Sequence, residues 1–481
     1  MVAALCRIMK QDGIRAVPFK SQNMALNSFV TREGHEMGRA QVVQAEAAGL
    51  EPHVDMNPVL LKPEADAKSQ VVVMGKPWKT VSAYDYYKYT PELFPIIEQS
   101  LNRLCSQYDA VVIEGAGSPA EINLRRFEIV NMAIAKLANA PVLLVGDIDK
   151  GGVFAQLVGT LVLLEEDERE LVKGFVINKF RGDLDILRPG LGMLEERTGV
   201  PVLGVVPYYH DILINEEDSI HRTDNLDSGG VIDIAVIYLP RISNSTDFEP
   251  LQQEPGVRLR YITSPLQMGN PDLIIIPGSK STVSDLLHII NTGLARTIRE
   301  KAEQGTRVIG ICGGFQMLGK SIEDPRGVES DHKHAEGIGL LDIHTVFEGD
   351  KTTHQVQAEV AAGTGILEGL NGEVLTGYEI HMGQTHLGRA GSAFRIMQRS
   401  GDKTDHLDGA INDDGTVFGS YMHGLFDNDS FRCTLLGNIK PGYQASSGVL
   451  FPSKDEQYDK LASVVRRSLD INRIYRICAM K

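Results

Sequence analysis

Short apolar runs alternate with longer helical stretches along the first half of the chain. Five of these runs are apolar at almost every position, which is typical of strands buried on both faces of a sheet. They are residues 15–19, 110–113, 142–145, 174–177 and 202–206. Strands that alternate with helices predict a parallel sheet covered by crossover helices. Each run ends in polar or glycine-rich residues, and open α/β sheets bind ligands at the carboxyl ends of their strands.

A polar segment, residues 216–230, interrupts this pattern near the middle of the chain. It is poor in core-forming residues, which is typical of a domain linker. A second series of strands is predicted at residues 232–238, 273–276, 308–311, 378–382 and 417–421. The run 378–382 alternates, so Glu379 and His381 are expected on its solvent face. The pattern predicts two α/β domains and a C-terminal helical tail, at residues 1–225, 231–437 and 438–481.

The composition excludes several classes of protein. A chain of 481 residues is long enough for about two to four domains of about 150 residues each. Its 48 basic and 63 acidic side chains give a net charge of −15, which argues against nucleic acid or an anionic membrane as the main partner. Five scattered cysteines predict a reducing cytoplasm, without a disulfide framework or a zinc site. No apolar run approaches the roughly eighteen residues that cross a bilayer, and an oligomer is compatible with this composition.

Cys312 lies in the sequence Gly-Ile-Cys-Gly-Gly-Phe-Gln, between an apolar strand and a helical stretch. Glycines beside a nucleophile permit the tight turn of a strand-to-helix elbow. A helix N-terminus and the backbone N–H groups near it favour a thiolate and can hold an oxyanion. The pattern therefore predicts that Cys312 is a nucleophile. The alternative is a buried structural cysteine in a glycine-rich turn.

A cysteine nucleophile needs a base, and His423 follows the predicted strand 417–421. We expect it to face Cys312 across one sheet edge, whereas the alternative is a hydrogen-bonded structural histidine. A second glycine turn, Pro-Gly-Ser-Lys at residues 277–280, ends another apolar strand. Its free backbone N–H groups can complete an oxyanion site.

The cysteine elbow, the Pro-Gly-Ser turn and the downstream histidine together resemble a class I glutamine amidotransferase domain. The resemblance implies that Cys312 attacks the carboxamide of glutamine, that a glutamyl thioester forms and that ammonia is released. It also places Gly278, Gly313 and Gln316 at the oxyanion and glutamine-binding site. The commonest class I sequence is His-Pro-Glu, whereas His423 here precedes Gly-Leu-Phe, so no orienting carboxylate is assigned. This departure is typical of the branch that contains cobyric acid and cobyrinic acid a,c-diamide synthases, which works with a Cys-His pair.

Longer motifs in the first half resemble the cobyric acid synthase family, and with the second half they extend the resemblance to nearly the whole chain. They are residues 18–28, 36–41, 55–63, 114–119, 146–154 and 178–183. The resemblance implies an α/β fold in both halves. The first is expected to be a P-loop, dethiobiotin-synthetase-like domain with a parallel sheet, and the second a class I glutamine amidotransferase-like domain.

Several polar residues of the first half are candidates for binding nucleotide or substrate. Glu114 follows an apolar strand and precedes glycines, where a P-loop-type fold places a Mg²⁺-coordinating acid. Lys20, at another strand end, can pair with a phosphate or a substrate carboxylate. Asn178 resembles the purine-reading asparagine of related synthetases, and Asn23 and Asn27 can bind nucleotide or substrate. The alternatives are a turn-capping carboxylate for Glu114, an exposed lysine with no specific role for Lys20, and ordinary loop hydrogen bonding for Asn178.

The chemistry implied by the resemblance joins the two halves. A carboxylate reacts with ammonia only after activation, so ATP with Mg²⁺ would convert it to an acyl phosphate. Ammonia from the Cys312 half would then displace phosphate and leave an amide. The family acts on the b, d, e and g carboxylates of adenosylcobyrinic acid a,c-diamide in cobalamin biosynthesis. The expected ligands are therefore ATP, Mg²⁺, glutamine and a corrinoid.

The G-x-x-x-x-G-K-[ST] phosphate cradle does not occur in these 481 residues. In the family this loop directly precedes the helix that begins at Val2 here. We therefore expect that about twenty residues, which carry backbone donors to phosphate, precede Met1 in the native protein. The alternatives are an ATP-incompetent truncated form or a scaffold. Another is an amidotransferase like cobyrinic acid a,c-diamide synthase, although the motif at residues 21–28 favours cobyric acid synthase.

Overall fold

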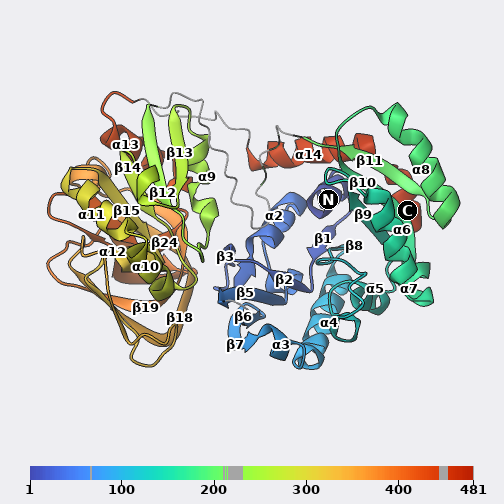
Figure 1. Cartoon of the computed structure of the whole chain (residues 1–481), viewed down its shortest axis with the longest axis horizontal. Helices are drawn as coiled ribbons and strands as arrows, with labels where there is room; N and C mark the ends of the chain where they lie inside the picture. Colours follow the sequence, from blue (N-terminus) through green and yellow to red (C-terminus); the bar gives the residue numbers. More distant parts are fainter. Residues whose placement is uncertain (66–67, 210–211, 213, 215–230, 444–452, 480–481) are drawn as a thin grey trace.

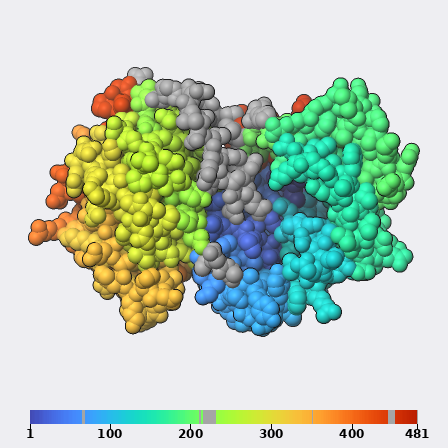
Figure 2. All heavy atoms as spheres, viewed as in Figure 1, coloured from blue at the N-terminus to red at the C-terminus, as the bar shows by residue number. Residues whose placement is uncertain are grey.

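The computed structural model describes residues 1–65, 68–209, 212, 214, 231–443 and 453–479. The predicted linker at residues 216–230 lies outside these residues. The described chain forms two lobes side by side (Figure 1). The first lobe contains the N-terminal half and the C-terminal helices, and the second contains residues 231–443. The lobes meet along a central seam (Figure 2). No described helix is both long enough and apolar enough to cross a membrane.

Two parallel sheets form the centre of the first lobe. One pairs β1 (Ala16–Phe19) with β8 (Ala110–Ile113). The other has the order β11-β10-β9 and contains β9 (Val142–Asp147), β10 (Val172–Phe180) and β11 (Val202–Pro207). These are the five predicted strands. The helices of this half are α1 (Val2–Gln11), α2 (Arg39–Ala48), α3 (Ala83–Tyr86), α4 (Thr90–Gln107), α5 (Met132–Ala138), α6 (Val153–Leu163), α7 (Glu166–Leu171) and α8 (Leu184–Thr198).

The expectation that all five strands are buried on both faces is wrong for β8, β9 and β11, and in β11 only Leu203 and Val206 are buried. All four residues of β8 are half-buried, and Val145 of β9 is 45% exposed. Among the described strands, β8 pairs only with β1 and β9 pairs only with β10. Each therefore lies at the edge of its sheet, where one side of a strand has no neighbouring strand.

A smaller sheet of the first lobe lies next to the second lobe (Figure 1). Its order is β2-β5-β6-β7, with β2 (Gln22–Met24), β5 (Val59–Ala65), β6 (Lys68–Val73) and β7 (Lys76–Ser82). A separate antiparallel pair contains β3 (Ser28–Val30) and β4 (Glu36–Gly38). Successive strand residues face opposite sides, so Val59 and Leu61 of β5 enter the core of the first lobe. Lys62 and Glu64 share the opposite face and reach toward the second lobe.

A six-stranded sheet is the centre of the second lobe. Its order is β13 (Val257–Ile262), β12 (Ile232–Ile237), β14 (Leu273–Ile276), β15 (Arg307–Ile311), β23 (Val417–Ser420) and β22 (Ala410–Ile411). Ile234 packs in one core with Leu435, whereas its neighbour Ala235 packs in another core with Leu286. Both faces of β12 are thus covered, which explains its continuous apolar run. The covering helices are α9 (Glu249–Gln253), α10 (Thr282–Asn291), α11 (Leu294–Glu303), α12 (Gly313–Leu318) and α13 (Asp429–Ile439).

A second, largely antiparallel sheet of this lobe was only partly predicted. It contains β16 (Ser321–Glu323), β17 (His334–Glu336), β18 (Ile343–Val360), β19 (Val374–Leu387), β20 (Phe394–Arg399), β21 (Asp402–Asp408) and β24 (Met422–His423). The predicted run 378–382 is the middle of the longer strand β19. Tyr378 of β19 pairs with His423 of β24, so this sheet reaches the carboxyl edge of the parallel sheet.

The C-terminal helices return to the first lobe. They are α14 (Lys454–Ser468) and α15 (Ile471–Ile477). Arg7 of α1 pairs with Asp455 and Asp459 of α14, at 2.7 Å in each case. Leu469 packs in one apolar cluster with residues of α1. These helices thus bury apolar surface of the first half, although they are far from it in sequence.

Candidate active site

Cys312 occupies the elbow between β15 and α12. Its backbone φ is 52° and its ψ is −112°, which is strained for a residue with a side chain. The glycines around it allow close backbone approach. A Cβ on Gly314 would lie 2.0 Å from the carbonyl oxygen of Ile276, and a Cβ on Gly310 would lie 2.7 Å from that of Gly314. The glycine pattern of the sequence is therefore a steric requirement of this turn.

The neighbouring strands bring the predicted amidotransferase residues together. β14, β15 and β23 are adjacent and parallel, so the segments that follow them meet at one sheet edge. A Cβ on Gly278 would lie 3.3 Å from Cε1 of His423. A Cβ on Gly313 would lie 3.0 Å from the backbone nitrogen of Ser279. The Pro-Gly-Ser turn thus lies against both the elbow and the histidine.

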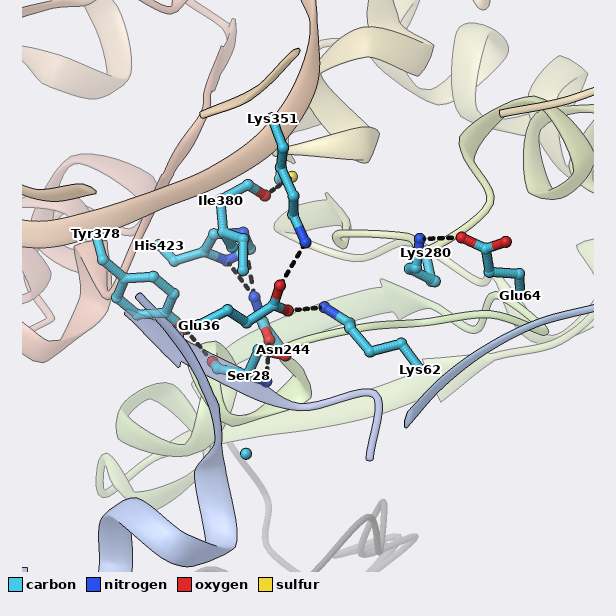
Figure 3. Close-up of polar contacts among 12 residues, drawn as sticks. Ser28, Glu36, Lys62, Glu64, Asn244, Lys280, Lys351, Tyr378, Ile380 and His423 are labelled. Atoms are coloured by element: carbon cyan, nitrogen blue, oxygen red, sulfur yellow. Dashed lines mark hydrogen bonds and ion pairs between the residues drawn. The ribbon is translucent and has the colours of Figure 1, made fainter. Parts of the chain in front are cut away.

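His423 is buried and is held on several sides. Its Nδ1 lies 2.6 Å from Oδ2 of Asp247, and the other oxygen of Asp247 accepts the N–H of Gly424 at 3.1 Å. Nδ2 of Asn244 lies 3.3 Å from Nε2 of His423, and the ring of Tyr378 stacks on the imidazole with centroids 5.1 Å apart (Figure 3). These contacts fix the orientation of the imidazole.

The charge state of His423 follows from these neighbours. Burial by itself lowers its pKa, but the attraction and hydrogen bond of Asp247, together with the interaction with Cys312, raise the pKa to about 10. The imidazolium is therefore the form present at neutral pH. An imidazolium at this position can donate a proton to a nitrogen that leaves during attack by the cysteine.

Asp247 was not predicted from the sequence. It lies in a short 3-10 helix, Ser245–Phe248, and 176 residues separate it from His423. No motif marks it, because the commonest class I sequence carries its carboxylate beside the histidine. The only signal was positional: the polar segment around Asp247 follows β12, a strand of the same parallel sheet.

A pocket opens beside Cys312, and Gln316 forms part of its wall. The side-chain nitrogen of Gln316 donates to the carbonyl of Met382 at 2.8 Å and to the hydroxyl of Tyr421 at 3.1 Å. Its side-chain oxygen accepts the hydroxyl of Thr282 at 3.2 Å. The carboxamide of Gln316 is thus engaged within the protein and holds the wall of the pocket in place.

The expectation that Glu379 and His381 lie on a solvent face is wrong. Glu379 is 2% exposed and pairs with Arg399 at 2.6 Å. His381 lines the pocket and stacks on Tyr421 with centroids 3.7 Å apart. The reason is that other parts of the lobe cover this face of β19: Arg399 packs on Glu379, and Tyr421 packs on His381.

The first lobe brings only some of its candidate residues together. Nζ of Lys20 lies 3.3 Å from Oε1 of Glu114, and Gln44 donates to the other carboxylate oxygen. Asn178 lies at the end of β10 beside Asp147, in the other parallel sheet. The side-chain oxygen of Asn23 accepts the backbone N–H of Met24, and that of Asn27 accepts the N–H of Ser245 across the two lobes. Asn27 is thus also a contact between the lobes.

Glu114 has the chemistry that a magnesium ion requires. Mg²⁺ prefers carboxylate oxygens and is usually held by one or two of them together with substrate phosphates. The described residues contain no group of three His, Cys, Asp or Glu side chains that would form a metal cage. A nucleotide-bound ion does not need one, so a single strand-end carboxylate beside Lys20 fits this role.

The fold and the site define a glutamine amidotransferase joined to a nucleotide-binding domain. Residues 233–431 match the model of the CobB/CobQ-like glutamine amidotransferase domain, and residues 1–220 match that of the CobQ/CobB/MinD/ParA nucleotide binding domain. The cobyric acid synthase of Dehalococcoides mccartyi strain CBDB1 is 53% identical over 99% of this chain and 95% of its own length. That of Sorangium cellulosum strain So ce56 is 54% identical over 100% of this chain and 96% of its own length. The chain belongs to the cobyric acid synthase family.

These findings confirm the predicted fold class, family and enzyme class. The family consists of glutamine-hydrolysing amidotransferase ligases, which carry out amidation in cobalamin biosynthesis. The structure of PurLQS from Thermotoga maritima matches 49% of this chain and 99% of its own, at 17% identity and a TM-score of 0.31.

Proposed function

We propose that this protein transfers the amide nitrogen of glutamine, at the expense of ATP, to carboxylates of adenosylcobyrinic acid a,c-diamide, and so makes cobyric acid. The b, d, e and g side chains are the proposed acceptors. The observation that carries the proposal is the cysteine elbow with its carboxylate-held histidine, in a chain about half identical to cobyric acid synthases across both lobes. A glutamine amidotransferase domain and a nucleotide-binding domain in one chain fit a reaction that releases ammonia in one domain and uses it in the other.

In the first half-reaction, Cys312 Sγ attacks the carboxamide carbon of glutamine. Backbone N–H groups of Gly313 and of the turn at Gly278 are proposed to hold the developing oxyanion. His423 gives a proton to the departing nitrogen, so that ammonia leaves and a glutamyl thioester remains. His423 then takes a proton from the water that hydrolyses the thioester to glutamate and free Cys312.

In the second half-reaction, a corrinoid carboxylate takes the γ-phosphoryl group of ATP, and ADP leaves. Ammonia attacks the acyl phosphate, phosphate leaves and an amide forms. Lys20 is proposed to pair with a phosphate or the substrate carboxylate, and Asn23, Asn27 and Asn178 are proposed to contact nucleotide or substrate. Glu114 would help to hold Mg²⁺, which neutralises charge on the phosphates. We also propose that the reaction uses Mg²⁺ and takes place in the cytoplasm.

The Cys312→Ala variant tests this division of labour. Without the thiol, glutamine-dependent amide formation on the corrinoid should fall by about 10³-fold or more, because no thioester can form. Amide formation from added ammonia and ATP should continue at the native rate. The readout is mass spectrometry of the corrinoid product. Glutamine-dependent activity that survives the substitution, or the absence of corrinoid amidation with either nitrogen source, would overturn the proposal.

A further inference from the structure

The pocket beside Cys312 is built by both lobes. Lys62 and Glu64 of β5, in the first lobe, line it together with Lys280 and Lys351 of the second lobe. Nζ of Lys280 lies 2.6 Å from Oε1 of Glu64 (Figure 3). The hydroxyl of Ser281 donates to the backbone oxygen of Glu64 at 2.8 Å. The first lobe therefore docks on the same turn that carries Gly278.

One side of this pocket carries an excess of positive charge. Lys62 and Lys351 each lie 2.5 Å from a different oxygen of Glu36, and we call these three residues the Glu36 cluster (Figure 3). Their side chains are 6%, 11% and 0% exposed, in the order Lys62, Lys351 and Glu36. Lys280 and Glu64 form a neutral pair beside it. Glu329 also lines the pocket, and burial raises the pKa of this carboxyl to about 7, so it is only partly ionised at neutral pH. The cluster thus places two ammonium groups against one carboxylate.

The charge states support this excess. Burial would raise the pKa of Glu36, but the two lysines lower it, so the carboxylate is ionised. Burial lowers the pKa of Lys351 to about 8, although Glu36 acts in the opposite direction. Lys351 is therefore charged in most molecules at neutral pH. A buried net charge is costly unless a counter-charge is supplied. One additional anion would therefore neutralise the net positive charge of the Glu36 cluster.

Glutamine supplies such an anion at the right end of the molecule. Its α-carboxylate is separated from the carboxamide by a short, flexible chain, so a carboxamide at Cys312 leaves the α-carboxylate within the same pocket. A charge-assisted hydrogen bond between ammonium and carboxylate is the strong kind of polar contact. None of the residues predicted from the sequence for the glutamine site, namely Gly278, Gly313 and Gln316, carries a positive charge.

We propose that Lys62 of the first lobe and Lys351 of the second lobe together bind the α-carboxylate of glutamine. The glutamine pocket is then complete only when the two lobes are docked. This inference rests on the proposed function, because it takes glutamine as the occupant of the Cys312 pocket. It adds a specificity element that comes from the nucleotide-binding half of the chain.

The test compares L-glutamine with its α-amide, in which a neutral carboxamide replaces the α-carboxylate. Glutaminase activity of the native protein should favour L-glutamine at least about tenfold in kcat/KM, since the charged contact is lost with the α-amide. In Lys62→Met, Glu36 keeps Lys351 as its partner and the charge excess disappears. KM for L-glutamine should rise at least about tenfold with kcat within about twofold, and the preference should collapse.

Two further variants and one activity keep the test decisive. Lys351→Met should repeat the loss of preference, because it removes the same excess charge. Lys76→Met changes an exposed lysine of the same small sheet and should leave the preference intact. Ammonia-dependent amidation reports whether each variant is folded.

The inference fails if Lys62→Met lowers kcat/KM for L-glutamine and for the α-amide by the same factor, or if it changes neither value. It also fails if the native protein does not prefer L-glutamine to the α-amide. Its failure is distinct from that of the proposed function, which would appear as a native protein without Cys312-dependent glutaminase activity.

Discussion

At the scale of single residues, Asp247 replaces the carboxylate that follows the histidine in the commonest class I sequence. The two carboxylate oxygens of Asp247 have different partners: one lies 2.6 Å from Nδ1 of His423, and the other accepts the N–H of Gly424. The carboxylate is therefore anchored to the segment that it orients. Hydrogen-bonded partners of this kind fix the tautomer and the direction of an imidazole.

The Asp247→Asn variant should lower glutaminase kcat/KM by about 10²–10⁴-fold, because His423 loses its orienting charge. Asp247 raises the pKa of His423 to about 10, so its removal lowers that pKa. The imidazolium form is then lost at lower pH, and the alkaline limb of the pH–kcat/KM profile should move to lower pH. Ammonia-dependent amidation should persist.

Asp402→Asn, a change at an exposed carboxylate of the same lobe, serves as the control. It should leave both the rate and the pH profile as they are. An Asp247→Asn protein with a native pH profile would mean that this carboxylate does not act through His423.

The residues that the sequence predicted are those carried by local motifs. Cys312, Gly278 and His423 each stand at a strand end with a recognisable turn, so pattern and topology agreed. Asp247 and the Glu36 cluster could not be predicted, because their partners are brought together only by the docking of distant segments. Lys351, for example, is 315 residues from Glu36 along the chain.

At the scale of elements, the elbow between β15 and α12 decides whether a nucleophile can stand at this sheet edge. The Gly314→Ala variant places a Cβ 2.0 Å from the carbonyl oxygen of Ile276, and backbone cannot move aside cheaply. The variant should lose about 1–3 kcal/mol of unfolding free energy of the second lobe, with loss of glutaminase activity. Thermal unfolding followed by calorimetry measures the first effect.

Gly437→Ala in α13 is the matched control, because a Cβ at this position has no atom within 4 Å. It should leave the unfolding free energy unchanged or raise it by up to about 1 kcal/mol, since alanine favours helix. Equal stability of the two variants would contradict the steric role assigned to Gly314.

The parallel strands were predictable because they read as short apolar runs, and β12, β14 and β15 are buried at nearly every position. The long strands β18 and β19 were predicted poorly, since they carry many polar residues that face the pocket or the other lobe. Glu379 is an example: it alternates like a surface residue but is buried with Arg399. Here tertiary packing overrides the local pattern.

At the scale of the whole molecule, the two lobes share their polar contacts at the site where ammonia is made. Tyr378 donates to the backbone oxygen of Ser28 at 3.2 Å, and Asn244 accepts the N–H of Ser28 at 2.8 Å (Figure 3). Asn244 also contacts His423. Ser28 of the first lobe is thus linked through Asn244 to His423, the proposed proton donor. This arrangement suits delivery of ammonia from one half to the other.

The transfer of nitrogen from glutamine to the corrinoid can be followed with an isotope label. The native protein is incubated with the corrinoid diamide, ATP, Mg²⁺ and glutamine labelled with ¹⁵N in its carboxamide, and the product is examined by mass spectrometry. We predict ¹⁵N in each new corrinoid amide with the native protein and none with Cys312→Ala. An amidated corrinoid without the label from the native protein, or equal labelling with Cys312→Ala, would contradict the transfer of nitrogen from glutamine through Cys312.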